Sequence, residues 1–491
     1  MNKYIRLAVF GGALAFVHPN NPLQTAVCFS IIGYVTTITL IPRLSEPFKG
    51  IGLKGKDMSK PPPVRELPES MGIVSAVTYL FIMFSLIPFI FFKYLVSFSA
   101  LSNDQSMLNT YTTQYESTKS QLFPHNKLAE YLSAVLCLQS TTLLGLFDDL
   151  FDIRWRHKFF LPAVASLPLL IVYYVDFSVT SVVIPSFLTD LKGGEQALEF
   201  LNFFIRLGNH VVTSVTGLSF SSLPTDYVIP ENSPKLLDLG IFYYFYMSAV
   251  SIFSPNSINI LAGINGLEVG QSVVLAIIFL TNDFCYLFSS NVSQAAYDSH
   301  LFSVIFIIPF IGVSLGLLQY NWFPARVFVG DTYCYFSGMV FAIVGILGHF
   351  SKTLLIFLLP QILNFIYSAP QIFGVIPCPR HRLPRFNLKD GLMYPSFGEL
   401  KKQGPVPRLL LNILEKLKLI KIERGNEGQI VKFSNMTIIN LFLVWFGPMR
   451  EDSLCLLILG VQLLVGFSMI AVRHTVGPWL FGYDNLSWGV K

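Results

Sequence analysis

Apolar runs long enough to cross a lipid bilayer as a helix recur along the whole chain. Examples are IVSAVTYLFIMFSLIPFIFF at 73–92 and FSVIFIIPFIGVSLGLL at 302–318. A helix needs about 20 apolar residues to cross the hydrocarbon core, where it must satisfy its own backbone groups because water is absent. The chain is 53% hydrophobic and 13% charged, whereas soluble domains have about 25% charged residues. The sequence therefore predicts an all-α polytopic membrane protein.

About ten transmembrane helices are expected from the apolar runs. Their approximate bounds are 23–42, 71–95, 127–147, 159–175, 240–255, 268–288, 302–320, 332–349, 353–376 and 453–473. They define a transmembrane domain at 23–475, preceded by an apolar segment of unknown role at 1–22 and followed by a tail at 476–491. Residues 5–17 resemble the core of a signal peptide, but a longer apolar run follows directly, so an uncleaved membrane segment is expected.

The segments between the expected helices alternate in charge. Basic residues gather at 43–70, at 148–158 and in a long loop at 377–435. By the positive-inside rule these segments face the cytosol. The segments at 96–126, 289–301 and an insertion at 176–238 are polar but poor in basic residues, which predicts that they face the opposite compartment. Clusters of basic and aromatic residues that would indicate nucleic-acid binding are absent from the sequence.

Two adjacent aspartates, Asp148 and Asp149, end an expected helix in the stretch LLGLFDDLFDIRWRHKFF. Carboxylates at the C-terminal end of a helix face the negative end of its dipole, so a cation or a proton must compensate them. A divalent cation would do so. The alternative is that they form ion pairs with Arg154, Arg156 or Lys158.

Amide side chains and glycine gather in SPNSINILAGINGLEVG at 254–270. If the stretch is helical, Asn256, Asn259 and Gly263 share one face, where the amide oxygens flank a position open to a ligand. Asn265 and Gly266 then form a turn. Alternatively, the amides hold helices together inside the membrane.

Asp331 lies in Gly-Asp-Thr at the start of another apolar run. Taken alone, it is typical of a helix N-cap. It is also a further oxygen donor at an expected cytosolic helix end. A donor set of carboxylates and amides, without thiolate or imidazole, suits Mg²⁺ or Mn²⁺.

The loop IPCPRHRLPRFN at 376–387 contains three prolines and four basic side chains. Prolines stiffen the loop, and arginine binds phosphate better than lysine does. A loop that only fixes membrane orientation would need the charge but not the stiffening. Together the four stretches indicate metal-assisted chemistry on a phosphate ester or pyrophosphate.

These motifs resemble those of the polyprenyl-phosphate N-acetylhexosamine-1-phosphate transferase superfamily, and most closely its eukaryotic, fungal-like members that use dolichyl phosphate. The matching stretches are LLGLFDDLFDIRWRHK, NSINILAGINGLEVGQS, VFVGDTYCYFSGMVFAIVGILGHFSKT and PCPRHRLPRF. The resemblance covers about 23 to 475. It implies a homodimeric enzyme of the endoplasmic reticulum membrane, with a cytosolic active site that tunicamycin would occupy. The implied reaction moves N-acetylglucosamine 1-phosphate from UDP-N-acetylglucosamine to dolichyl phosphate, releasing UMP, as the first step of N-glycan precursor assembly.

The resemblance also implies residue roles. The implied metal ligands, for Mg²⁺ or Mn²⁺, are Asn259 and Asp331. The implied catalytic residues are Asp148, Asp149 and Lys158. The implied substrate-binding residues are Glu69, Asn256, Gly263, Asn265, Phe328, Arg380, His381 and Arg382. Asp149 could deprotonate the acceptor phosphate, or it could only hold the lysine and the metal in place.

Besides a purely structural membrane scaffold, two other functions remain open at this point. One is a related transferase that uses another UDP-sugar or another polyprenyl phosphate. The other is a membrane transporter, in which polar residues would line a permeation path. Transporters place ionisable groups near the membrane midplane and often contain internal repeats. Here the acidic residues fall at expected helix ends, and no repeat is obvious.

Overall fold

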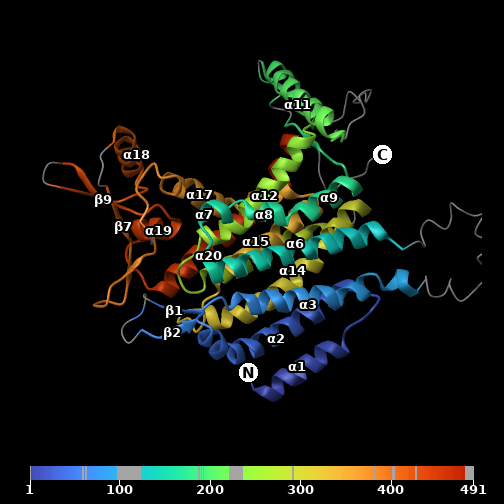
Figure 1. The fold of residues 1–491 in the computed structure, drawn as a ribbon, viewed down its shortest axis with the longest axis horizontal. Coiled ribbons are helices and arrows are strands. Elements are labelled where there is room, and N and C mark those ends of the chain that lie inside the picture. The colour runs from blue at the N-terminus through green and yellow to red at the C-terminus, as the bar shows by residue number, and fades with distance from the viewer. Residues whose placement is uncertain are drawn as a thin grey trace, which may run out of the picture.

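The structure, a computed structural model, describes residues 2–57, 60, 64–96, 123–185, 188, 191, 193–220, 236–289, 292–379, 382–400, 404–425 and 428–481. It is mainly helical (Figure 1). The helices of the N-terminal half are α1 (Lys3–Ala15), α2 (Pro22–Gly50), α3 (Gly72–Ile90), α6 (His125–Phe151), α7 (Trp155–Lys158), α8 (Leu161–Ala165), α9 (Leu167–Asp176) and α11 (Gly194–Thr216). Those that follow are α12 (Ile241–Ile260), α13 (Leu267–Leu287), α14 (Gln294–Asn321), α15 (Gly330–Leu347), α16 (Ser351–Phe357), α17 (Leu359–Ile372), α18 (Pro405–Lys416), α19 (Ile438–Phe446) and α20 (Glu451–Phe481).

Short strands form small antiparallel sheets outside the helices. They are β1 (Lys54–Lys56), β2 (Glu66–Pro68), β3 (Ser181–Val183), β4 (Leu236–Asp238), β5 (Arg385–Phe386), β6 (Met393–Tyr394), β7 (Phe397–Glu399), β8 (Ile422–Arg424) and β9 (Ile430–Ser434). β1 pairs with β2, β3 with β4, and β5 with β6, while β9 lies between β7 and β8. In β1–β2 the register places Gly55 opposite Leu67.

Seven helices of the described part are long and apolar enough to cross a membrane: α2, α3, α6, α13, α14, α15 and α20. The pair α16 and α17, bent by 68° at the break between them, could form an eighth span. This confirms the expected class, an all-α polytopic membrane protein. The expected number of ten stays a prediction, because α12 is not among the seven and the segment expected at 159–175 is divided among α7, α8 and α9.

Prolines explain the interrupted spans. Pro162 and Pro168 lie in the first turns of α8 and α9, and Pro360 lies in the first turn of α17. Proline lacks a backbone N–H and clashes with the preceding turn, so a helix tends to start again where it occurs. Hydropathy alone does not distinguish such a broken segment from a straight span.

The spanning helices pack around α15, of which 89% is buried. α15 contacts α3, α6 and α12, while α14 packs against α2 and α13. α6 and α15 approach closely because Gly145 has no side chain. A Cβ there would lie 2.6 Å from the Cα of Thr332. Such close backbone contact is typical of helix pairs in membranes, and it brings the end of α6 against the start of α15.

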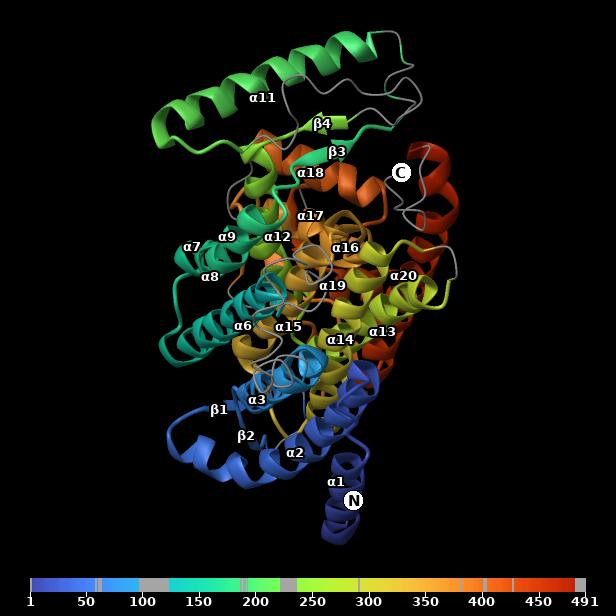
Figure 2. The same ribbon diagram turned by 90° about the vertical axis from the view of Figure 1, so that its right-hand side faces the viewer.

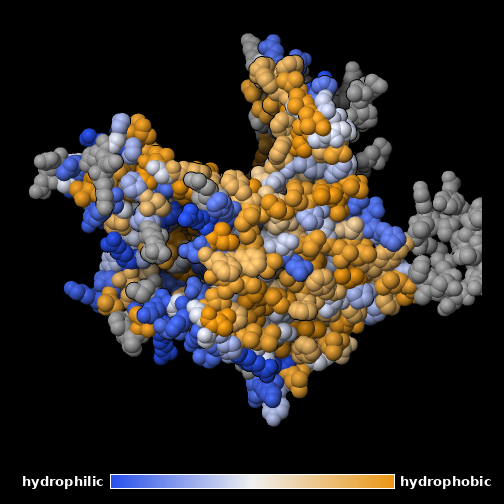
Figure 3. Space-filling view, in the orientation of Figure 1, coloured by the Kyte–Doolittle hydropathy of each residue, from blue (hydrophilic) through white to orange (hydrophobic). Residues whose placement is uncertain are grey.

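The segment between α17 and α20 forms a small unit at one end of the helices (Figure 1). Its core includes Ile376, Leu411 and Phe433, which come from the α17–β5 connection, α18 and β9. A second cluster, which contains Leu261 and Met393, joins this unit to the turn between α12 and α13. Figure 3 shows an apolar band across the helices and polar residues gathered at the end that carries this unit. The site residues described next lie at this end.

Candidate active site

The carboxylate of Asp149 caps the N-terminus of α15. It accepts hydrogen bonds from the backbone N–H of Asp331 (2.6 Å) and of Thr332 (3.2 Å), and from the Thr332 hydroxyl (2.5 Å). The first turn of a helix has N–H groups without partners in the helix, and a carboxylate satisfies them well. The N-cap position of α15 is Val329, so the interpretation of Asp331 as an ordinary N-cap is wrong. The cap comes from another helix, so the Asp331 side chain does not serve as the cap and can bind other groups.

Lys158 joins two of the aspartates. Its ammonium nitrogen lies 2.7 Å from Oδ2 of Asp148 and 2.9 Å from Oδ2 of Asp331. The Asp148 side chain is 1% exposed and that of Asp331 is 31% exposed, so Asp331 is the one that a ligand can reach. Burial lowers the pKa of Lys158, but the carboxylates of Asp331 and Asp148 outweigh this effect and raise that pKa above its usual value. Lys158 is therefore a cation at neutral pH.

The expected ion pairs of the Asp148–Asp149 doublet are thus correct in part. Asp148 pairs with Lys158 and also accepts the backbone N–H of Ile153 at 3.0 Å. Asp149 instead binds backbone and hydroxyl donors of α15. The turn that brings Lys158 back to Asp148 begins at Asp152, which has a left-handed conformation (φ 48°) and ends α6.

Asn259 completes the group around Asp331. Its amide nitrogen donates to Oδ1 of Asp331 at 2.8 Å. Asn256, one turn earlier in α12, donates to the backbone oxygens of Ile252 (2.8 Å) and Phe159 (3.3 Å). Asn256 therefore holds the chain after α7 against α12, which is the helix-joining alternative of the sequence analysis.

The expectation that Gly263 shares a helical face with these amides is wrong, because α12 ends at Ile260. Gly263 lies in the following turn, where its backbone N–H donates to Oε1 of Glu268 at 2.8 Å. A Cβ on Gly263 would lie 2.0 Å from Cδ2 of Leu383. The turn at 263 therefore touches the loop that contains Arg382, so two of the four motifs are in contact.

Asn265 is the centre of a polar network, and Asn265 and Gly266 form the expected turn. The side-chain oxygen of Asn265 accepts the N–H of Ala325 at 2.8 Å. Its backbone N–H donates to Oε1 of Glu451 at 2.7 Å. Lys60 binds the other oxygen of Glu451 at 2.6 Å and lies 3.2 Å from Oδ2 of Asp57.

Sequence reasoning missed Asp57, Lys60, Glu268 and Glu451. Lys60 and Asp57 come from a segment interpreted only as a basic loop, and Glu451 starts a helix expected at 453. Glu451 is 3% exposed. An acidic residue directly before a spanning run is an indication that could have been used, because a carboxylate there needs a partner. Its partner lies 391 residues away in sequence, which local patterns do not reveal.

Glu69 and Phe328 lie beside the start of α15. The backbone N–H of Phe328 donates to the oxygen of Pro68 (2.8 Å), and that of Met71 donates to the oxygen of Phe328 (3.0 Å). These hydrogen bonds fix the segment around Glu69 next to Asp331. Loss of hydration, followed by the charges of Asp149 and Asp331, raises the pKa of Glu69.

Arg382 lies partly buried in the loop after α17. Its backbone oxygen accepts hydrogen bonds from the Asn440 side chain (2.8 Å) and the Ser396 hydroxyl (3.1 Å). Its Nη1 is buried without a hydrogen-bond partner in the described structure. Burial lowers the pKa of Arg382. A buried guanidinium nitrogen without a partner is a place where an anionic or polar ligand group would be stabilised. Arg380 and His381 lie outside the described residues.

Oxygen donors at the site suit a hard divalent cation, although they form no large acidic cage. Within the described ranges, no group of three or more His, Cys, Asp or Glu side chains is arranged to hold a metal. Mg²⁺ commonly uses one or two carboxylates together with substrate phosphates and water. The accessible carboxylate of Asp331 beside the amide of Asn259 fits that pattern.

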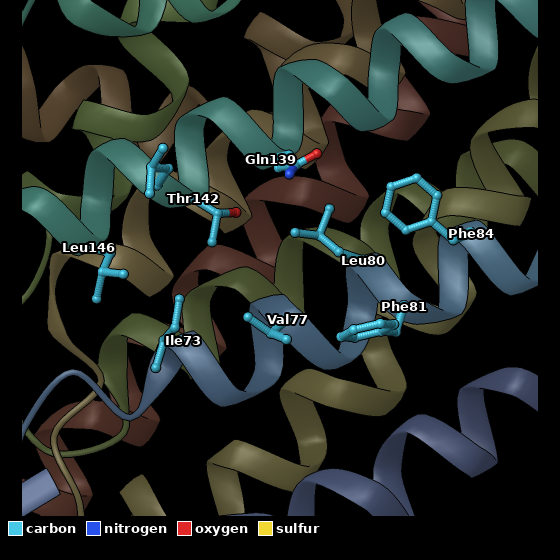
Figure 4. A pocket seen from close by; sticks show the side chains of 9 residues that line it. Ile73, Val77, Leu80, Phe81, Phe84, Gln139, Thr142 and Leu146 are labelled. Carbon is cyan, nitrogen blue, oxygen red and sulfur yellow. The ribbon is translucent and has the colours of Figure 1, made fainter.

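An apolar cavity of about 300 Å³ lies between α3 and α6 (Figure 4). It is lined by Ile73, Val77, Leu80, Phe81, Phe84, Gln139, Thr142, Leu143 and Leu146. None of these residues carries a charge, so the cavity does not contribute to phosphate binding. Its lining does not include the site residues Asp148, Asp149, Lys158, Asn259 or Asp331.

Comparison with known proteins identifies the relatives of the chain. It is 52% identical to the UDP-N-acetylglucosamine–dolichyl-phosphate N-acetylglucosaminephosphotransferase of Saccharomyces cerevisiae over 472 residues, which are 96% of this chain and 95% of the yeast protein. The chain belongs to this enzyme family. The Schizosaccharomyces pombe enzyme of the same name is 46% identical over 97% of each chain.

The match to a broader family model falls on the helices that form the site. The sequence model of glycosyl transferase family 4 matches residues 131–349, which run from within α6 to just past the end of α15. A phospho-N-acetylmuramoyl-pentapeptide-transferase of Desulfitobacterium hafniense is 36% identical over 173 residues, which are 32% of this chain and 49% of that protein. The match to family 4 therefore includes Asp148, Asp149, Lys158, Asn259 and Asp331. Membership of the N-acetylglucosaminephosphotransferase family agrees with the resemblance on which the residue roles rest.

Proposed function

We propose that the protein transfers N-acetylglucosamine 1-phosphate from UDP-N-acetylglucosamine to dolichyl phosphate, giving N-acetylglucosaminyl-diphosphodolichol and UMP. This is the first step of N-glycan precursor assembly. The observation that carries the proposal is the Lys158 ammonium held between Asp148 and Asp331, with Asn259 beside them. Such a group of charges at one end of a membrane bundle suits phosphate transfer to a lipid.

The reaction forms one bond and breaks one bond. A phosphate oxygen of dolichyl phosphate attacks the phosphorus that carries the sugar, and the bond from that phosphorus to the UMP oxygen breaks. Negative charge develops on the leaving UMP, and Lys158 supplies a fixed positive charge nearby. Because a phosphate monoester is already an anion near neutral pH, positioning and charge stabilisation contribute more than proton removal.

Asp331 and Asn259 would hold Mg²⁺ or Mn²⁺ through their side-chain oxygens. When bound, the metal would neutralise charge on the diphosphate of the donor. Asp149 would keep Asp331 in place, because both of its oxygens accept donors from the first turn of α15. This geometry supports a positioning role for Asp149 rather than that of a base.

The donor would be bound by the turn after α12 and by the loop after α17. Gly263 touches Leu383 of that loop, and Arg382 has a buried nitrogen that needs a partner. We assign the nucleotide to the turn around Gly263 and Asn265, and the sugar and pyrophosphate to Arg382 together with Arg380 and His381. Glu69 and Phe328 would border the metal and the acceptor phosphate.

The protein would act in the endoplasmic reticulum membrane as a homodimer. The basic segments at 43–70, 148–158 and 377–435 all contribute to the end of the bundle that carries the site, which supports a cytosolic orientation. Tunicamycin would compete with the donor because it would occupy the same place.

A donor and acceptor panel tests the proposal. The purified protein is given UDP-N-acetylglucosamine, UDP-N-acetylgalactosamine or UDP-glucose, together with dolichyl phosphate or a shorter polyprenyl phosphate, and lipid-linked product is measured. The proposal expects product chiefly from UDP-N-acetylglucosamine with dolichyl phosphate. A preference for another pair would support the alternative of a related phosphosugar transferase, and no product from any pair would contradict the proposal.

A further inference from the structure

α11, which lies in the long segment between α9 and α12, has an exposed apolar face. The residues that form this face are Phe200, Phe203, Phe204, Leu207, Val211 and Val215. Their exposed fractions range from 49% for Leu207 to 80% for Val215. Their spacing of three or four residues places them on one side of the helix as a continuous stripe. A stripe of this size exposed to water is unusual and marks a surface that binds something apolar.

α11 contacts the rest of the protein through a different side. Ile205 is 6% exposed, and a Cβ on Gly208 would lie 2.8 Å from the ring of Phe242. The side-chain oxygen of Asn209 accepts the N–H of Ile241 at 2.9 Å. These contacts join α11 to the start of α12 and do not cover the apolar face. A third side carries polar residues such as Arg206.

The position of α11 follows from its contact with α12. α12 starts at Ile241 beside α11 and contains Asn259 of the catalytic site near its other end. Eighteen residues of helix at about 1.5 Å each place Asn259 about 27 Å from Ile241 along the axis of α12, which is not among the seven spans named above. The chain just after α11 is fixed next to α9, because the hydroxyl of Tyr174 near the end of α9 donates to the oxygen of Ser219 at 2.9 Å. α11 therefore lies beside the end of α12 that is far from the catalytic site, and beside the end of α9.

The direction of α11 differs from that of the spanning helices. Figure 1 shows α3 along its length and α11 foreshortened, whereas Figure 2 shows α11 along its length. α11 thus runs across the spans, roughly in the plane of a membrane. In Figure 3 its apolar surface adjoins the apolar band of the bundle.

We propose that α11 lies flat in the lipid–water boundary on the membrane face opposite the catalytic site, with its apolar face inserted between lipid headgroups. Amphipathic helices of this kind bury their apolar face about 5–10 Å deep. α11 contains two acidic residues, Glu195 and Glu199, and one basic residue, Arg206, so its formal net charge is −1 with His210 neutral. Insertion would therefore depend on apolar burial and not on anionic lipid. This inference does not depend on the proposed reaction.

Spin labels on the full-length protein in phosphatidylcholine nanodiscs test the proposal. The parent carries Cys285→Ser and Cys378→Ser, because these two cysteines are exposed and the other four are buried. One pair of variants, Leu207→Cys and Arg206→Cys, places the label on the apolar or the polar side. A second pair, Val211→Cys and His210→Cys, repeats the comparison if a member of the first pair does not fold. Accessibility to oxygen, which partitions into lipid, is compared with accessibility to a water-soluble nickel chelate.

The proposal expects the ratio of oxygen to nickel accessibility to be several-fold higher for Leu207→Cys and Val211→Cys than for their neighbours. The ratios should change little when a third of the lipid is anionic. Equal nickel accessibility on both sides would show that α11 stands in water and would overturn the proposal. Labels at Leu207 and Val211 shielded from both reagents would show that protein, such as a second copy of the chain, covers this face, and would also overturn it.

Discussion

The carboxylate of Asp149 accepts the backbone N–H of Asp331 at 2.6 Å, although the two aspartates are 182 residues apart in sequence. One aspartate thus acts as the helix cap that holds the other in position. The close contact of Gly145 with Thr332 makes this possible, because it lets α6 end directly against the first turn of α15. The arrangement of the site therefore depends on helix packing as much as on the acidic residues themselves.

Replacing Asp149 by alanine should reduce both activity and stability. Loss of a helix cap costs about 0.5–2 kcal/mol. Displacement of Asp331 by about 1 Å should lower kcat by about 10²-fold. Thermal unfolding and UMP release measure the two effects. The matched variant Thr332→Val removes only the hydroxyl contact and should lose much less activity and much less stability. An Asp149→Ala protein with an unchanged unfolding temperature would refute the cap.

Replacing Lys158 by alanine should abolish most turnover. The ammonium holds Asp148 and Asp331 together, and its loss leaves the buried Asp148 without its charged partner, at a cost of about 1–3 kcal/mol. Lys158→Arg keeps the charge but not the compact shape, so it should recover only part of the activity. Initial rates at saturating donor distinguish the three proteins. If Lys158→Ala turned over at the native rate, the lysine would have only a structural role.

Replacing Glu451 by alanine should weaken donor binding more than it slows turnover. Glu451 accepts the backbone N–H of Asn265 and pairs with Lys60, so its loss should loosen the turn that we assign to the nucleotide. We expect KM for UDP-N-acetylglucosamine to rise several-fold with a smaller change in kcat. The adjacent Asp452, which pairs with the exposed Arg450, supplies the control, and Asp452→Ala should leave both constants unchanged. Equal effects of the two variants would contradict the role of this network.

Glu69→Gln should change how stability depends on pH. The pKa of Glu69 is raised in the folded protein, so its neutral form is favoured there. Its contribution to stability is present below the unfolded pKa of about 4.5 and is lost as pH rises through the folded pKa. Glutamine stays neutral, so the variant should match the wild type near pH 4 and become more stable at higher pH, by less than about 0.5 kcal/mol because the side chain is exposed. Thermal unfolding between pH 4 and pH 8 checks this. A variant that is more stable than the wild type only at low pH would contradict the prediction.

The sequence predicted the fold class, the polar helix ends and the turn at Asn265, because these depend on local composition. It could not predict that Asp149 caps α15, because that hydrogen bond depends on how two distant helices pack. The prediction that Asn256, Asn259 and Gly263 share one helical face is wrong beyond Ile260, because α12 ends there and the chain turns toward the loop around Leu383. The partners of Glu451 could not be predicted either, because they also depend on distant packing. Lys60 lies in a segment whose charge indicated only the membrane orientation.

The most direct test of the account compares UMP release with lipid-linked product for the wild type and for Asp331→Ala, in proteins matched for thermal stability. The account predicts one UMP for each N-acetylglucosaminyl-diphosphodolichol in the wild type, with both products requiring dolichyl phosphate and Mg²⁺ or Mn²⁺. It predicts loss of both products in Asp331→Ala. UMP released at the same rate without dolichyl phosphate, or near-native product formation by Asp331→Ala, would contradict it.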